Sequence, residues 1–89
     1  MRSVRYESLS WQDRRRVREE YIEEQKGLCY WCGFPLNERP TEYKKIDLRL
    51  FPPNFLKYPV HLHHDHVTGM TIGAVHAECN AVLWQYHGE

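Results

Sequence analysis

The sequence of 89 residues lacks three features that would place it in a common class of proteins. It has no excess of charge of either sign, since twelve basic residues balance twelve acidic ones, and the cation–phosphate contacts that dominate non-specific DNA affinity are not favoured overall. No apolar run approaches the roughly 18 residues of a membrane span, so we expect no membrane association. With only three cysteines, the thiols cannot all pair with one another, which argues against a disulfide scaffold.

The length of the chain predicts a single domain that needs an additional source of stability. Small domains bury a modest fraction of their surface, and a bound metal often compensates for the small core. Arg2 and Arg5 are followed by polar residues rather than by an apolar segment, so we expect no secretory signal. Reduced cysteines bound to zinc in the cytoplasm therefore explain the cysteine count better than disulfides do.

The cysteines and one histidine form two pairs with matching spacing. In each pair two residues separate the ligands, which lets both reach one ion from a knuckle or from the first turn of a helix. The competing interpretation is that the cysteines are buried free thiols. The repeated spacing favours a structural Zn²⁺ site made of Cys29, Cys32, His76 and Cys79.

A helix is predicted over residues 10–26. Ser10, followed three residues later by Asp13, is typical of an N-cap with an acidic first turn, and Gly27 is typical of a C-terminal stop. At about 100° per residue, five apolar or aromatic side chains fall within one stripe that we expect to face the core. They are Trp11, Val17, Tyr21, Ile22 and Leu28.

An arginine cluster occupies the first half of this helix and precedes four glutamates. Arg14 and Arg18 fall on the same side as the apolar stripe. One interpretation is that their stems pack at the edge of the core while their charges pair with glutamates. The other is that they face a phosphate backbone, which makes Arg14 and Arg18 candidate DNA-binding residues.

Turn residues divide the single domain of residues 1–89 into four parts. After the N-terminal helix (1–27) comes a zinc knuckle (28–36), and then a loop rich in proline and aromatic residues (37–59) with a short strand around residues 46–50. In the last part (60–89) the residue pattern predicts a hairpin followed by a helix. Its strands are expected over residues 62–66 and 70–75, its turn over residues 67–69 and its helix from His76 to about His87.

Three histidines occur within four residues of the first predicted strand. Alternation of side chains places His64 and His66 on one face and His63 and Asp65 on the other. A histidine with a near-neutral pKa is suited to deprotonate water, and a second imidazole or a carboxamide oxygen can hold a divalent ion. The competing interpretation is a second structural zinc site.

The two cysteine-containing segments and the histidine cluster resemble the HNH, or ββα-metal (His-Me finger), nucleases. The similarity is to the branch typified by phage recombination endonuclease VII. That branch has a Cys-x-x-Cys knuckle, then Asp-His-x-His-x-Thr-Gly, a strand, and Cys-x-x-Cys-Asn-x-Ala at the start of a helix. The matching residues are 27–32 and 62–83, roughly half of the chain.

The resemblance implies a role for each matching residue. It implies that His64 is the general base, that His66 is a second catalytic histidine, and that His63 and Asn80 hold a catalytic divalent ion. His63 replaces the aspartate of the endonuclease VII branch, but colicin nucleases carry a His-His pair at this position. The zinc ligands are the same four residues that the spacing predicts, with His76 in place of a cysteine.

Two further features of the motif affect this interpretation. Ile72 stands where the family usually has an arginine before glycine, so phosphate stabilisation would need an arginine from the first helix. A different register would take Asp65 and His66 as the Asp-His pair, but it moves Thr68 and Gly69 out of step with the motif. Loss of the aspartate should favour Mn²⁺, Co²⁺ or Ni²⁺ over Mg²⁺, because these ions accept imidazole readily.

Together, these patterns predict an α+β domain, and the resemblance implies that it is of the ββα-metal class. By resemblance it would be a metal-dependent DNA endonuclease of the cytoplasm of a bacterial or phage-infected cell, with structural Zn²⁺ and a catalytic ion such as Mn²⁺ or Mg²⁺. We expect a monomer that nicks one strand. The alternatives are a non-catalytic zinc-stabilised module that binds nucleic acid or protein, and a zinc hydrolase, although no His-Glu-x-x-His motif is present.

Overall fold

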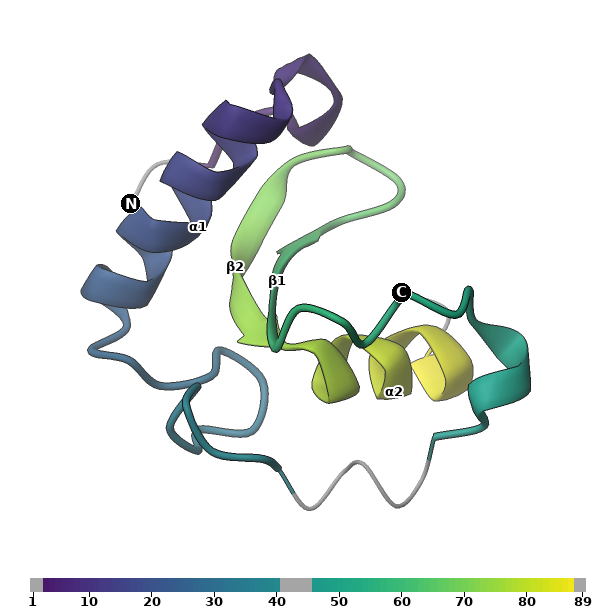
Figure 1. Cartoon of the computed structure of the whole chain (residues 1–89). Helices are drawn as coiled ribbons and strands as arrows, with labels where there is room; N and C mark the ends of the chain where they lie inside the picture. Colours follow the sequence, from purple (N-terminus) through teal and green to yellow (C-terminus); the bar gives the residue numbers. More distant parts are fainter. Residues whose placement is uncertain (1–2, 41–45, 88–89) are drawn as a thin grey trace.

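The structure, a computed structural model, describes residues 3–40 and 46–87 and has the predicted α+β class. An antiparallel two-stranded hairpin contacts both α-helices (Figure 1). No helix in the described ranges is both long and apolar enough to cross a membrane. In chain order the elements are η1 (Tyr6–Ser8), α1 (Trp11–Glu24), η3 (Leu48–Leu50), β1 (Val60–His64), β2 (Thr71–His76) and α2 (Ala77–His87).

Helix α1 begins at its predicted N-cap and ends two residues earlier than predicted. The Ser10 hydroxyl accepts a hydrogen bond from the Asp13 amide at 3.1 Å. After Glu24 the backbone leaves the helical region, with φ of 58° at Lys26 and 76° at Gly27. Glycine adopts this left-handed conformation without steric penalty, which makes position 27 suited to the turn that follows the helix.

The predicted apolar stripe of α1 is only partly buried. Val17 and Tyr21 belong to the core, and Ile22 packs against it. Trp11 and Leu28, by contrast, are exposed, so the prediction that they face the core is wrong. Periodicity identifies the side of a helix but not how far a packing partner extends along it, and Leu28 lies beyond the end of the helix.

The hairpin forms as predicted, but its first strand begins and ends two residues earlier. His63 pairs with Gly73 and His64 pairs with Thr71, so Ile72 forms an irregularity between the two pairs. Asp65 leaves the strand because its carboxylate accepts hydrogen bonds from the next turn, and local side-chain bonds of this kind compete with strand pairing. The expected alternation therefore stops at His64, since His66 lies beyond the end of β1.

The N-terminal segment runs beside β2 and carries Tyr6 to the turn of the hairpin. The Thr71 amide donates to the Val4 carbonyl at 2.8 Å, and the Tyr6 amide donates to the Gly69 carbonyl at 2.8 Å. The buried hydroxyl of Thr71 also lies 2.9 Å from the Tyr21 hydroxyl of α1. These contacts join the N-terminus, α1 and the hairpin into one core.

Helix α2 follows β2 without a connecting loop. His76 is the last residue of β2, and α2 begins at Ala77, one residue later than predicted. Cys79, in the first turn, is fully buried against the hairpin core. This direct connection fixes the position of Asn80 relative to the strands, because the helix cannot rotate about a flexible linker.

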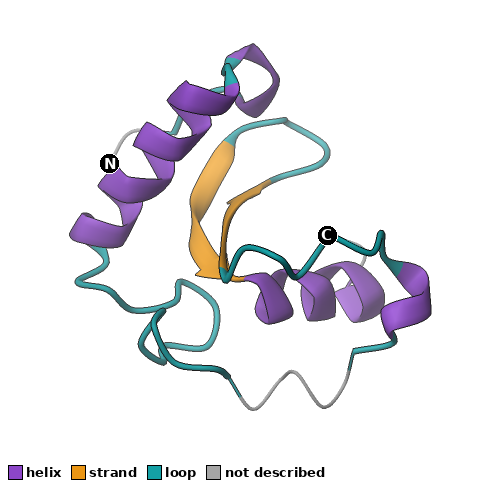
Figure 2. Ribbon diagram, in the orientation of Figure 1, coloured by secondary structure: helices purple, strands orange, loops and turns teal. Residues whose placement is uncertain are grey.

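The segment between α1 and β1 is mostly loop, and the short strand predicted around residues 46–50 is wrong (Figure 2). A turn of 3₁₀ helix, η3, forms there instead. The Asp47 carboxylate accepts a hydrogen bond from the Arg49 amide at 3.1 Å, which caps η3 and favours a turn over an extended chain. The Asp47 amide donates to the side chain of Gln85 at 2.8 Å, which ties the loop to α2. Residues 41–45 of the predicted loop lie outside the described residues.

Candidate metal cluster and histidine cleft

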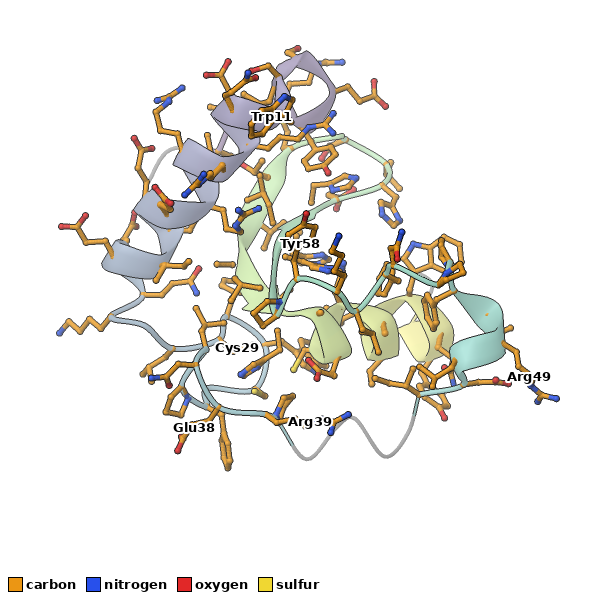
Figure 3. All side chains as sticks on the ribbon, in the orientation of Figure 1. Trp11, Cys29, Glu38, Arg39, Arg49 and Tyr58 are labelled. Atoms are coloured by element: carbon orange, nitrogen blue, oxygen red, sulfur yellow. The ribbon has the colours of Figure 1, made fainter. Side chains whose placement is uncertain are left out.

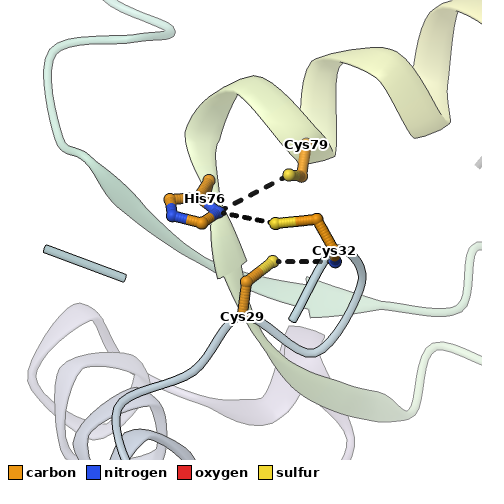
Figure 4. A group of neighbouring side chains, drawn as sticks. All are labelled: Cys29, Cys32, His76 and Cys79. Atoms are coloured by element: carbon orange, nitrogen blue, oxygen red, sulfur yellow. Dashed lines mark hydrogen bonds between the residues drawn. The ribbon is translucent and has the colours of Figure 1, made fainter. Parts of the chain in front are cut away.

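The four side chains predicted as zinc ligands converge on one point, although they come from the knuckle, the end of β2 and the start of α2 (Figure 4). Their ligand atoms all lie within 4.8 Å of one another. Three thiols and one imidazole around one point form a donor set that suits tetrahedral zinc. The cluster of Cys29, Cys32, His76 and Cys79 could therefore hold a metal ion such as zinc.

The imidazole of His76 is oriented for this role by its second nitrogen. Nε2 lies 2.8 Å from the Pro35 carbonyl oxygen, to which it donates a hydrogen bond. Nδ1 points instead towards the sulfurs, 3.4 Å from Cys32 and 3.5 Å from Cys79. A backbone carbonyl that fixes the tautomer in this way is a common support for a metal-binding histidine.

The knuckle also directs backbone amides at Cys29. The amides of Trp31 and Cys32 donate to its sulfur at 3.3 and 3.5 Å. A hydrogen bond from Cys79, together with those amides and that of His76, lowers the pKa of Cys29 to about 4 despite burial, and the same contact raises the pKa of Cys79. The sharp turn that aims the amides uses Gly33, whose φ is 79°.

A separate cleft of about 1040 Å³ brings together the remaining predicted site residues. Its wall is contributed by the N-terminal segment, α1, the loop before β1, the hairpin and α2. The predicted site residues that line it are His63, His64, His66, Asn80, Arg14 and Arg18. Asp65 does not line it, because its carboxylate is held in the hairpin turn by the amides of Val67 and Thr68.

His64 is held between two aromatic rings at the end of β1. Its imidazole stacks on Tyr6 with a centroid distance of 3.9 Å and an interplanar angle of 8°. The His66 ring lies in an edge-on arrangement with it, at a centroid distance of 4.9 Å. Burial lowers the pKa of His64, and the adjacent His66 lowers it further. A hydrogen bond to the backbone of Leu62 acts in the opposite direction. The ring is thus favoured in its neutral form.

Arg14 and Arg18 are placed differently from the other arginines of α1, although Arg15 also lines the cleft. The guanidinium of Arg14 lies over the Tyr6 ring, 4.1 Å from its centroid, and its Nε is buried with no hydrogen-bond partner among the described residues. Arg15 and Arg16 form ion pairs with acidic residues of the same helix, and the partner of Arg15, Glu19, lines the cleft as well. Within the described ranges neither Arg14 nor Arg18 forms such a pair, which contradicts the interpretation that they pair with glutamates.

Sequence analysis did not identify His61, which lies beside Asn80 in the cleft. The Asn80 amide donates to Nδ1 of His61 at 3.1 Å. Burial lowers the pKa of His61, while a hydrogen bond to the backbone of Phe55 raises it. Its position two residues before His63, on the same face of a strand, was the available signal, because alternation places both side chains together.

Comparison with known proteins adds no relative. No protein-family model, curated protein sequence or solved structure matches the chain.

Proposed function

We propose that the protein is a metal-dependent DNA endonuclease of the HNH type. The observation that carries the proposal is the content of one cleft: the adjacent histidines His63, which is buried, and His64, which is half-buried, a carboxamide from the following helix, and two arginines without acidic partners among the described residues. A general base, ligands for a divalent ion and phosphate-binding cations are the components of phosphodiester hydrolysis.

His63 and Asn80 would hold the divalent ion. Imidazole nitrogen and carboxamide oxygen are compatible with Mn²⁺, Co²⁺ or Ni²⁺, and one neutral imidazole in place of a carboxylate disfavours Mg²⁺. When bound, the ion would supply Lewis-acid stabilisation of charge on the phosphate and the leaving oxygen. Both residues line the cleft, and Asn80 is oriented by its bond to His61.

His64 would accept the proton of the attacking water. Its lowered pKa keeps the imidazole neutral near pH 7, and contact with the Leu62 backbone leaves the other ring nitrogen available as the acceptor. As that nitrogen takes the proton, the water oxygen forms a bond to phosphorus and the bond to the leaving oxygen breaks. Stacking on Tyr6 restricts rotation of the ring and so keeps the imidazole in one orientation.

The cysteine cluster would support this site through the first turn of α2. Asn80 directly follows Cys79, so zinc bound to the cluster would fix the first turn of α2 and thereby the carboxamide. Immobilising a neighbour of a site residue limits the motion that would otherwise weaken ion binding. The zinc would therefore be structural and would take no part in the reaction.

Incubation of supercoiled plasmid with the purified protein and a panel of divalent ions tests the proposal. We expect nicked circles with Mn²⁺, Co²⁺ or Ni²⁺, less product with Mg²⁺, and none in a His64→Ala control. The control must retain zinc and a cooperative thermal transition. Absence of cleavage with every ion would favour the alternative, a zinc-stabilised binding module without catalytic activity.

A further inference from the structure

Three large aromatic side chains on the wall of the cleft are exposed to solvent. Trp11 comes from the first turn of α1, Tyr58 from the loop before β1 and Trp84 from α2 (Figure 3 labels the first two). Their exposed fractions are 69%, 65% and 54%. Exposed aromatics gathered around one concave site, rather than scattered, indicate a surface that contacts a ligand.

The charge of the same cleft limits what that ligand is. Arg15 and Glu19 of the lining form an ion pair with each other, whereas Arg14 and Arg18 have no acidic partner among the described residues. The buried Nε of Arg14 also lacks a hydrogen-bond acceptor there. The ligand should therefore be anionic. The chain as a whole has no net charge, however, because twelve acidic residues balance its twelve basic ones, so contacts with the many phosphates of a duplex are not favoured overall. Affinity must then come largely from a second interaction.

Base stacking is an interaction that exposed aromatic rings can provide. Each base of an unpaired strand presents a π-face, and stacking of this kind contributes affinity without sequence preference. In a duplex the bases stack on one another and offer only their edges in the grooves. A cleft of about 1040 Å³, near the upper end of the size of pockets that enclose small ligands, has room for an unpaired segment.

We infer that the substrate is single-stranded DNA, or an unpaired segment of DNA, that binds in this cleft; this inference rests on the proposed function. The bases stack on Trp11, Tyr58 and Trp84 around the histidines. The phosphates lie against Arg14 and Arg18.

Binding experiments without added divalent ion separate this inference from the catalytic proposal. Fluorescence anisotropy would compare a labelled 12-nucleotide thymidine strand with a 12-base-pair duplex, using wild type, Tyr58→Leu and Trp84→Leu. Tyr86→Leu is the matched control, because Tyr86 lies on α2 and is 58% exposed but does not line the cleft. Zinc content and the thermal transition show that each variant is folded.

We expect wild type to bind the single strand at least tenfold more tightly than the duplex. Each cleft variant should lose about tenfold in affinity for the strand, in line with the contribution of one stacked base, while Tyr86→Leu stays within about twofold. Quenching of tryptophan fluorescence by the strand, reduced in Trp84→Leu, would add support.

Two results would overturn the inference. One is equal or tighter binding of the duplex. The other is an equal effect of the control and cleft variants. Tighter binding of an RNA strand of matched sequence would overturn the assignment to DNA. If the aromatic variants weaken strand binding but no ion supports cleavage, the inference stands as a binding property and the endonuclease proposal fails.

Discussion

The side-chain amide of Asn80 donates a hydrogen bond to Nδ1 of His61 at 3.1 Å, across the junction between α2 and β1. Because Nδ1 accepts this bond, the neutral ring of His61 carries its proton on Nε2 and can donate it to the backbone of Phe55. The amide is thereby held with its nitrogen towards His61. Its oxygen, the atom suited to a divalent ion, is left for the cleft.

His61 should therefore matter for metal dependence although it need not touch substrate. We expect His61→Phe, which keeps the ring but removes the acceptor, to raise the Mn²⁺ concentration needed for half-maximal nicking by about tenfold, the effect typical of losing an outer-shell partner. The rate at saturating Mn²⁺ should change much less. An unchanged metal requirement would show that the hydrogen bond does not position Asn80, and His61→Asn tests whether another polar side chain restores it.

The cysteine cluster should determine whether the protein folds. We expect Cys32→Ala to lose bound zinc and the cooperative unfolding transition, because a structural zinc contributes on the order of 10 kcal/mol in small domains. The measurements are metal content by mass spectrometry and circular dichroism against temperature. Folded wild-type protein with less than half an equivalent of tightly held zinc would refute the assignment.

Local signals predicted the elements better than their packing. Ser10, Gly27 and Gly69 identified the start or end of an element because capping and positive φ depend on a few neighbouring residues. The metal cluster was predictable from spacing alone. By contrast, the exposure of Trp11 depends on contacts between distant segments that no local pattern encodes.

The same limit explains what was missed in the cleft. Tyr6 stacks on His64 because the N-terminal segment pairs with β2, a contact between residues more than sixty positions apart in sequence. The prediction of a strand around residues 46–50 was wrong for a local reason, because the side chain of Asp47 caps the 3₁₀ turn that forms there instead.

Arg14 should contribute to DNA affinity while Arg16 should not. Both belong to α1, but Arg14 lines the cleft and Arg16 pairs with Asp13 and Glu20 outside it. We expect Arg14→Gln to weaken binding and to reduce the slope of log affinity against log salt by roughly one unit, the contribution of one phosphate contact. Arg16→Gln is the matched control. Equal slopes for both variants would indicate that α1 lies away from the DNA.

The Asp47–Arg49 pair should make the loop sensitive to acid. Hydrogen bonds from the side chain and backbone of Arg49 lower the pKa of the Asp47 carboxyl below 3.8. A group whose pKa is depressed on folding stabilises the fold above its unfolded pKa, and this contribution is lost as the pH falls through the folded pKa. We expect NMR titration of the Asp47 carboxyl carbon to show a pKa closer to 3.8 in Arg49→Met. The control Lys57→Met, which removes a different cation from this loop, should leave it unchanged.

The roles proposed for the histidines can be separated by metal rescue. His64→Ala should reduce Mn²⁺-dependent nicking by a factor of order 10² or more, with zinc and folding retained, because added metal cannot replace a missing proton acceptor. His63→Ala and Asn80→Ala should lose activity at low Mn²⁺ and recover part of it in excess, since high concentration compensates for weak affinity. His66→Ala should have the smallest effect, because His66 is exposed and contacts His64 only through its ring edge. An active His64→Ala enzyme beside an inactive His66→Ala enzyme would instead assign the base to His66, the register in which Asp65 and His66 form the catalytic pair.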